Sequence, residues 1–334
     1  MGGGWCKVGE GLLTMSVLPP RPPYDPELAA ILADAGDRIP TATMTLDMVP
    51  MMRQATPIDV DNAMLAAAGL ARRDLAIEGY EGAEIGVSVI ARADHSGIGP
   101  GILHTHGGGM VAGNRMTGMH ILLPWIVAHD AVVVTVDYRL APEFPDPYPV
   151  EDCHAALVWT AKHAAELGID PGRLTIAGVS AGGGLAAGTA LLARDRGGPR
   201  LAGQILLCPM LDDRDRTVST LQCETGLWDR ASNRMGWTAL LGDRRGTDDV
   251  SIYAAPARAT DLSGLPPAFI DCASAEVFRD EDVAYASALW AAGVQAELHV
   301  WPGGFHGFDM FADAALSKAA IAARNAWVAR HLGS

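Results

Sequence analysis

Short apolar runs alternate with stretches of helical length along most of this chain, and this alternation limits the fold more than any other feature of the sequence. The runs begin at about residue 85 and are rich in β-branched residues, at 85–90, 131–136, 174–177, 204–207, 268–270 and 296–300. Most are separated by stretches of helical composition, at 150–167, 183–194, 282–292 and 314–331. Short strands that are apolar throughout and alternate with helices predict a mostly parallel sheet covered on both faces, which is the α/β class.

Two segments interrupt the alternation and predict a second, smaller unit. Residues 212–264 contain no strand signal and place Trp228 and Trp237 among charged residues, as a helical insertion would. The first 75 residues precede the alternating part, and we expect both segments to contribute to a helical cap over the ends of the strands. The predicted organisation is an N-terminal tail with part of the cap at 1–75, a core in two parts at 76–211 and 251–334, and a cap insertion at 212–250.

The N-terminal segment is rich in Gly and then in Pro up to about residue 22, which predicts a mobile tail, and Met15 could be the natural start. Asp25 offers an N-cap, Pro26 suits the first helical position and Gly36 is a stop signal. A short helix is therefore expected between them. The stretch Met1–Ser16 has one Lys and no long apolar core, so it does not resemble a secretory signal.

Composition and charge exclude several classes of function. Apolar residues make up 49% of the chain and charged residues 19%, so a sizeable core can form. The formal net charge of −14 argues against a protein that binds nucleic acid or an anionic membrane surface. No stretch approaches the roughly eighteen consecutive apolar residues of a membrane span. The cysteines are odd in number and lack CxxC spacing, which predicts reduced thiols in a cytoplasmic protein: Cys6, Cys153, Cys208, Cys223 and Cys272.

The only GxSxG pentapeptide in the chain lies at residues 178–182 and places Ser180 at its centre. A nucleophilic Ser needs such a pattern because it sits on a sharp strand-to-helix turn, which closes only between neighbours without side chains. An apolar strand, Arg173–Ala177, precedes the motif, and a helix of small residues, Gly183–Leu192, follows it. The alternative is a Gly-rich turn with a structural Ser, but this context favours Ser180 as a nucleophile.

A second Gly-rich motif, His106-Gly107-Gly108-Gly109, follows the strand that ends at Ile102-Leu103. Three consecutive glycines cost backbone entropy, so a fold keeps them where N–H groups must approach another group closely. Acyl transfer requires such donors to stabilise its oxyanion, and each donor lowers the activation barrier by roughly 3 kcal/mol. His106 is expected to anchor this loop by hydrogen bonds.

Metal and phosphate sites are the alternatives for this loop. His104 and His106 are two apart, but no third ligand follows nearby, so no metal site is predicted. The Lys and the Ser or Thr of a phosphate-binding loop are missing as well.

The candidate general base is His306, on the Gly-flanked loop 301–308 after the last strand. Carboxylates that could orient it occur at Asp271, Glu276, Asp280, Glu281 and Asp282. Asp271 lies inside a strand, and Asp280 to Asp282 suit the positive end of the next helix. Glu276 lies just past the strand, and the order Ser180, Glu276, His306 is the one expected for an α/β-hydrolase. A Glu can replace Asp here because the task is to hold the imidazole tautomer and stabilise its charge.

Five blocks in register resemble those of the bacterial hormone-sensitive-lipase-like esterases, within the α/β-hydrolase superfamily. They lie at 106–109 (His-Gly-Gly-Gly), 137–143 (Asp-Tyr-Arg-Leu-Ala-Pro-Glu), 178–182, 265–268 (Leu-Pro-Pro-Ala) and 304–308 (Gly-Phe-His-Gly-Phe). The resemblance covers about residues 85 to 332. It implies an eight-stranded, mostly parallel sheet with a helical cap. It also implies hydrolysis of carboxylic esters, usually with short or medium acyl chains, without a cofactor.

The resemblance also assigns roles to individual residues. Ser180 matches the nucleophile and His306 the base, and the backbone N–H groups of Gly108, Gly109 and Ala181 match the oxyanion donors. The family usually has Asp-Pro-Leu-Arg-Asp-Glu where this chain has Glu-Val-Phe-Arg-Asp-Glu at 276–281. Alignment on the last three of these residues puts Glu276 on the catalytic carboxylate, thirty residues before His306.

A further departure from the family is Val179, where Asp or Thr is frequent. Because that side chain precedes the nucleophile, the change alters the support of the turn.

The predicted reaction is a double displacement on a small-molecule ester, through an acyl-enzyme. Two alternatives stay open: an amide or lactone hydrolase with the same triad, and a non-catalytic small-molecule-binding homologue. Dimerisation through an edge strand is common among relatives, so a homodimer is compatible with the sequence, which does not establish it.

Five of the thirteen methionines fall within 21 residues near the N-terminus: Met44, Met48, Met51, Met52 and Met64. Met is flexible and polarizable, so this cluster could line an acyl pocket beneath the cap. The alternative is that these side chains only fill gaps between the cap helices and the core.

Overall fold

The alternating segments fold into one eight-stranded sheet in a computed structural model that describes residues 18–36, 43–55 and 60–333. The strand order is β1-β2-β4-β3-β5-β6-β7-β8. The strands are β1 (Leu70–Glu78), β2 (Glu84–Arg92), β3 (Gly99–Thr105), β4 (Val132–Asp137), β5 (Ile169–Val179), β6 (Gly203–Leu207), β7 (Ala268–Ala273) and β8 (Ala296–Trp301). β2 runs antiparallel to β1 and β4, and every other pair is parallel. The predicted α/β class and mostly parallel sheet are therefore confirmed.

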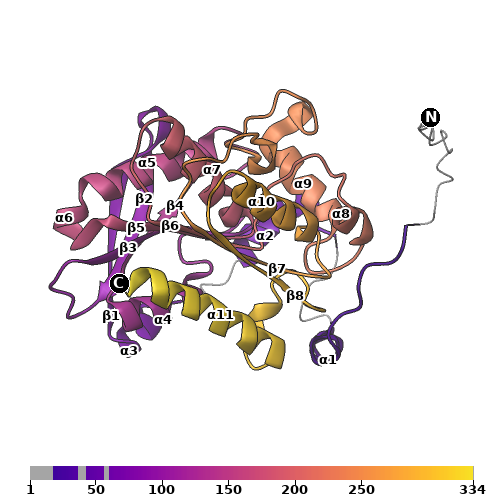
Figure 1. Ribbon diagram of the computed structural model, residues 1–334, viewed down its shortest axis with the longest axis horizontal. Helices are drawn as coiled ribbons and strands as arrows, with labels where there is room; N and C mark the ends of the chain where they lie inside the picture. The colour runs from indigo at the N-terminus through magenta and orange to yellow at the C-terminus, as the bar shows by residue number, and fades with distance from the viewer. Residues whose placement is uncertain (1–17, 37–42, 56–59, 334) are drawn as a thin grey trace, which may run out of the picture.

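Helices cover both faces of the sheet (Figure 1). One face carries α5 (Tyr148–Lys162), α7 (Ala181–Asp195) and α10 (Arg279–Ala291), and the other carries α4 (Met119–His129) and α11 (Ala315–Leu332). β4 shows why the strands read as unbroken apolar runs. Val132 and Val134 pack into the core under the first group of helices, while Val133 packs under the second group.

The edge strand β1 was not expected from the sequence, which showed strand signals only from about residue 85. It pairs on one side alone, with β2, and its buried residues are confined to Leu70 and Ile77 at its two ends. Charged residues fill its middle, as is usual for an edge strand that must not pair with other chains. Such a strand lacks the apolar run that marks the central strands.

Residues 212–264, which include the predicted cap insertion 212–250, contain helices and no strand, as the lack of a strand signal predicted. This region is built from α8 (Val218–Gln222) and α9 (Arg230–Leu241), followed by 3-10 turns η4 (Gly242–Arg244) and η5 (Pro256–Arg258). N-terminal residues reach this region, because the Thr43 hydroxyl donates to the Asp229 carboxylate and the Met44 N–H donates to Ser232 Oγ at 2.8 Å. Two chain segments far apart in sequence therefore meet there.

Other N-terminal elements lie elsewhere. α1 (Pro26–Ala35) has Asp25 as its N-cap and Gly36 as its C-cap, as expected. The Asp25 carboxylate accepts from two backbone N–H groups. After it come η2 (Leu46–Met48), α2 (Val49–Ala55) and α3 (Asn62–Ala67), of which α3 packs on β1. Most of the predicted mobile tail lies outside the described residues. Its described end contacts α8, where Gln222 donates to the Pro19 and Pro20 carbonyls.

The methionine cluster divides between different surroundings. Met44 and Met52 are partly buried against the core, whereas Met51 is 54% exposed and Met64 on α3 is 48% exposed. The cluster as a whole therefore does not line one pocket, and only Met44, Met48 and Met52, which are half-buried, remain candidates for that role.

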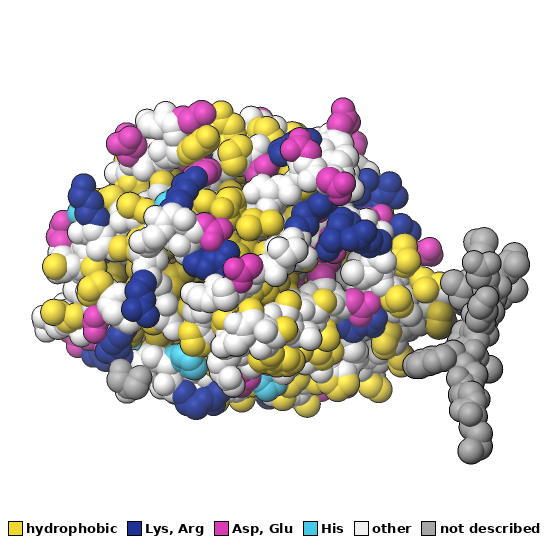
Figure 2. Space-filling view, turned by 45° about the horizontal axis from the view of Figure 1, so that its top comes forward, with side chains coloured by type: hydrophobic (Ala, Val, Ile, Leu, Met, Phe, Trp, Pro, Cys, Tyr) yellow, Lys and Arg dark blue, Asp and Glu magenta, His cyan; other side chains and the backbone are white. Residues whose placement is uncertain are grey.

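Charges on the surface are mixed in sign. The face seen in Figure 2 carries basic side chains beside acidic ones, so no broad area of that face is basic. Among the described residues, no helix has both the length and the apolar character needed to cross a membrane.

Candidate active site

Ser180 occupies the turn between β5 and α7 with φ 58° and ψ −121°, a conformation that residues with a side chain rarely adopt. Such backbone strain costs about 1–3 kcal/mol and persists only where the surroundings enforce it. Here the Ser180 N–H donates to the Leu207 carbonyl at 2.8 Å, and the Ser180 carbonyl accepts from the N–H groups of Gly184 and Met210. Backbone bonds to β6, to the segment after it and to α7 thus hold the turn in place.

Two glycines of the pentapeptide are required by close backbone contacts. A Cβ on Gly182 would lie 2.0 Å from the Thr105 carbonyl oxygen and 2.5 Å from that of His106. A Cβ on Gly178 would lie 2.2 Å from the Gly182 carbonyl oxygen. The turn therefore packs directly against the start of the Gly-rich loop, and no larger residue fits at either position.

Ser180, His306 and Glu276 form a continuous chain of hydrogen bonds. His306 Nε2 lies 3.0 Å from Ser180 Oγ, and His306 Nδ1 lies 2.7 Å from Glu276 Oε2. The other carboxylate oxygen of Glu276 accepts the Ala273 N–H at 2.6 Å. The Glu276 side chain is fully buried, whereas that of His306 is 15% exposed. The edge of the Phe278 ring packs on the imidazole, with ring centroids 5.1 Å apart.

The topology explains how residues so distant in sequence meet. Glu276 follows β7 and His306 follows β8, and these strands are parallel neighbours whose carboxyl ends lie at one edge of the sheet. Their loops are tied together, because the Ala275 N–H donates to the Gly304 carbonyl at 3.0 Å.

Two of the other candidate carboxylates, Asp271 and Asp280, bond to different groups. Asp271 Oδ2 accepts from Arg324 Nε at 2.7 Å and from the Trp301 indole at 3.2 Å. Burial raises the pKa of the Asp271 carboxyl, and Arg324 partly offsets this effect. Arg324 also pairs with Asp309, three residues beyond His306, so α11 braces the loop that carries His306. At the start of α10, Asp280 accepts the Ser219 N–H at 2.7 Å.

The Gly-rich loop is held by His106 and Tyr138. Their rings stack with centroids 4.1 Å apart, and the Tyr138 hydroxyl donates to the His106 carbonyl at 2.8 Å. His106 Nδ1 lies 2.8 Å from the Gly107 carbonyl. Burial lowers the pKa of His106 to about 4, although the Gly107 carbonyl and Asp137 oppose the shift. A ring that stays neutral and bonds within its own loop suits an anchoring role.

The oxyanion donors expected from the sequence are the backbone N–H groups of Gly108, Gly109 and Ala181. Gly108 and Gly109 have φ values of 122° and 62°, and Ala181 begins α7 directly after Ser180. In the described part of the chain, no hydrogen bond involves the N–H of any of these three residues. A Cβ on Gly109 would lie 2.3 Å from the ring of Trp228, so the cap roofs this loop.

The histidine pair considered for a metal does not converge on one point. His104 Nδ1 contacts Thr135 Oγ1 at 2.9 Å, and burial lowers the pKa of His104 to about 3. Among the described residues, two other sets bring ligand atoms within 4.8 Å of one another: Cys208, Glu276 and His306, and Cys272, Glu276 and Asp282. No sequence motif indicates either set, because their members lie on different strands, loops and helices.

The cysteines that the structure describes carry free, buried thiols, at positions 153, 208, 223 and 272, as predicted. Cys6 lies outside the described residues.

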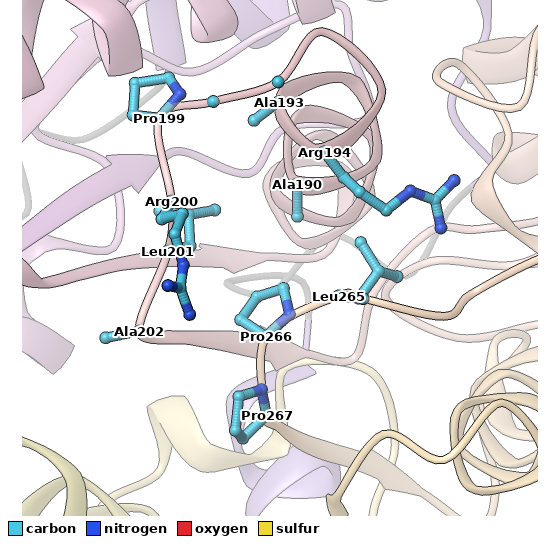
Figure 3. Close-up of a pocket in the computed structure, with 13 residues that line it drawn as sticks. Ala190, Ala193, Arg194, Pro199, Arg200, Leu201, Ala202, Leu265, Pro266 and Pro267 are labelled. Atoms are coloured by element: carbon cyan, nitrogen blue, oxygen red, sulfur yellow. The ribbon is translucent and has the colours of Figure 1, made fainter.

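A surface pocket of about 430 Å³ lies away from Ser180 (Figure 3). It is lined by the end of α7, residues 197–202 before β6, and residues 264–267 before β7. Because it opens at the amino ends of β6 and β7, it is separate from the site at the carboxyl ends of the strands.

Comparison with known proteins gives consistent results. A family described as having the alpha/beta hydrolase fold matches residues 102–310. Carboxylesterase NlhH of Mycobacterium tuberculosis is 41% identical over 216 residues, covering 64% of this chain and 67% of that protein. Esterase LipI of the same organism is 35% identical over 256 residues, covering 72% and 75%. The crystal structure of a bacterial heroin esterase superposes with a TM-score of 0.84 at 39% identity, covering 93% of this chain and 98% of that one.

The glycine contacts generate a prediction about stability. Gly182→Ala should lower the free energy of unfolding in urea by about 1–3 kcal/mol or more, because its Cβ would overlap two carbonyl oxygens. The control is Gly97→Ala, since a Cβ at Gly97 has no neighbour within 4 Å. Equal stabilities for the two variants would show that the turn does not depend on this contact.

Proposed function

Since this chain belongs to the α/β-hydrolase fold family and, within it, to the hormone-sensitive-lipase-like carboxylesterases, we propose that it hydrolyses carboxylic esters through an acyl-enzyme on Ser180. The hydrogen-bonded chain from Ser180 Oγ through His306 to Glu276 is the observation that carries this proposal. Its distances of 3.0 and 2.7 Å suit transfer of a proton from a hydroxyl to an oriented imidazole.

The reaction proceeds in two displacements. His306 Nε2 takes the proton of Ser180 as Oγ attacks the ester carbonyl, and His306 then gives that proton to the leaving alcohol. Water, deprotonated by His306, releases the carboxylic acid by the same path in reverse. Glu276 accepts the Nδ1 hydrogen, which selects the reactive tautomer and stabilises the imidazolium.

The oxyanion of each tetrahedral intermediate is bound by the backbone N–H groups of Gly108, Gly109 and Ala181. Their lack of partners within the described chain supports this role, since free donors can bond to the oxyanion when it forms. Tyr138 and His106 keep the loop in shape, so the donors are oriented before the substrate arrives.

The substrate class is a small ester with a short or medium acyl chain. Trp228 supports this choice because its ring lies against Gly109 and limits the space above the oxyanion loop. Similar proteins are named carboxylesterase, esterase and heroin esterase, which accords with small ester substrates for this chain.

Replacement of the nucleophile or the base tests the reaction itself. Ser180→Ala and His306→Ala should each lower kcat for p-nitrophenyl acetate by several powers of ten, and the double variant should be scarcely worse, because the two residues act as a unit. Fluorophosphonate should label the wild type and not Ser180→Ala. An unlabelled wild type would instead indicate a non-catalytic binding protein.

The choice of carboxylate has its own test. Glu276→Gln keeps the side-chain shape but removes the charge that stabilises the imidazolium, so kcat should fall by orders of magnitude. Asp271→Asn and Asp280→Asn remove charges that bond to Arg324 and Ser219 instead, so kcat at saturating substrate should largely persist. The assignment of Glu276 is wrong if kcat of Glu276→Gln stays near the wild-type value while kcat of Asp271→Asn or Asp280→Asn falls by orders of magnitude.

Acyl-chain preference is measured on p-nitrophenyl esters from acetate to palmitate. The wild type should favour the short and medium esters, and Trp228→Ala should shift kcat/KM toward longer ones, because each buried methylene contributes about 0.8 kcal/mol. Trp290→Ala, which removes a half-exposed indole from α10, should leave the profile unchanged. Parallel profiles for all three proteins would remove Trp228 from the acyl site.

A further inference from the structure

Asp282 is a buried carboxyl group beside Glu276 for which the proposed reaction has no use. It lies in the first turns of α10, and its exposed fraction is zero. Neither carboxyl oxygen has a hydrogen-bond partner among the described residues. One of these oxygens, an oxygen of Glu276 and the Cys272 sulfur all lie within 4.8 Å of one another. Two buried carboxyl groups are thus neighbours next to the imidazole.

The neighbours of Glu276 and Asp282 are mostly acids that already have donors. Glu281 on the same helix accepts the N–H groups of Leu211 and Asp212, and Asp271 on β7 pairs with Arg324. Glu276 itself accepts from Ala273 and His306. Asp282 has no N–H or O–H donor, and only the weakly donating Cys272 thiol is close enough to lower the pKa of its carboxyl by hydrogen bonding. A buried carboxylate so poorly hydrogen-bonded is strongly disfavoured.

Electrostatics point the same way. The titratable groups that face Asp282 are Glu281, Glu276, Asp271 and the Cys272 thiol. Burial, followed by the three acidic neighbours, raises the pKa of the Asp282 carboxyl well above its ordinary value, and Cys272 only partly offsets this. Burial also raises the pKa of the Glu281 carboxyl well above its ordinary value, but the N–H groups of Leu211 and Asp212 oppose that shift. Like charges this close disfavour joint ionisation, and Asp282 lacks such backbone donors, so it is the better candidate for the neutral acid.

We propose that Asp282 is a neutral carboxylic acid that donates its O–H to the Glu276 carboxylate and so positions Glu276 for His306. A protonated carboxyl is a donor, and each Glu276 oxygen keeps a second lone pair that can accept it. A contact between two carboxyl groups is a hydrogen bond only when one carries a proton, which accounts for the missing partner. The positioning role rests on the function proposed for Glu276, whereas the protonation of Asp282 does not.

A metal cation is the other candidate for this place, because Cys272, Glu276 and Asp282 offer a thiol and two carboxylates. A cation bound to Glu276 would repel the positive charge that His306 gains during the reaction. A proton on Asp282 leaves the negative charge of Glu276 available to His306. The chemistry of the site therefore favours the proton.

Infrared spectroscopy of the purified full-length protein tests the protonation directly. The infrared difference spectrum of wild type minus Asp282→Asn at neutral pH should contain the carbonyl stretching band of a protonated carboxylic acid. This band should shift when the solvent is changed to D₂O. Glu281→Gln is the comparison variant: it removes a neighbouring acid that raises the pKa of Asp282, but the Asp282 band should remain because burial is the larger cause of that shift. Absence of this band, or one equivalent of tightly bound metal by elemental analysis of the wild type, would overturn the proposal.

Kinetics test the positioning role. An Asn amide can still donate to Glu276 and an Ala cannot, so kcat of Asp282→Asn should exceed that of Asp282→Ala by about tenfold, with similar KM. Because no charge is lost, the acid limb of the kcat/KM profile should coincide for wild type and Asp282→Asn. An ionised Asp282 would predict a shift of that limb to lower pH, since removing a negative charge lowers the pKa of the nearby base.

Each outcome is decisive. Equal kcat values for the Asn and Ala variants, or a shifted acid limb, would refute the positioning role. If the Ala variant does not fold, the acid limb of Asp282→Asn and the infrared band still decide. If Glu276→Gln proved fully active, the choice of carboxylate would fail, while the infrared band would still report the state of Asp282.

Discussion

The strained backbone of Ser180 is the constraint on which the rest of the structure depends. The turn closes only because Gly182 lies against the carbonyl groups of Thr105 and His106, so the end of β3 and the start of α7 must touch. That contact brings the turn against the Gly-rich loop, since a Cβ on Gly107 would lie 3.7 Å from Ser180 Cβ. The hydrogen bond from Ser180 to Leu207 then fixes the turn to β6. Central strands buried on both faces provide a rigid base for this arrangement.

The parallel arrangement of the strands brings the three side chains together. β5, β7 and β8 end at the same edge of the sheet, so short loops are enough to carry Ser180, Glu276 and His306 into contact. Each side chain is held by its own element: Ser180 by the turn, Glu276 by the Ala273 N–H, and the His306 loop by the bond from Arg324 to Asp309. The helical segment 212–264 supplies Trp228, whose ring lies against Gly109. The sheet and its loops thus hold the three side chains in place, whereas the segment 212–264 supplies the ring beside the Gly-rich loop.

Much of this arrangement could be predicted because its signals are local. The central strands are apolar runs, the turn is a pentapeptide, and Glu276 and His306 each follow a strand in the order known for the fold. β1 was missed because an edge strand carries charges rather than an apolar run. Asp282 was interpreted as part of a charged helix start, because its burial beside Glu276 depends on how α10 packs on β7. The methionine cluster could not be assigned to one pocket from the sequence, because spacing along the chain does not reveal that Met51 and Met64 face solvent.

The ion pairs of Arg324 with Asp271 and Asp309 affect the order in which the site can assemble during synthesis of the chain. Ser180 and its turn are synthesised 126 residues before His306, and Arg324 comes 18 residues later still, on the last helix. A growing polypeptide on the ribosome can therefore form the nucleophilic turn long before the imidazole loop has its anchor. Until α11 has emerged and docked, Asp271 and Asp309 lack their ion pairs with Arg324. Biosynthesis thus delays the bracing of the His306 loop until α11 has formed.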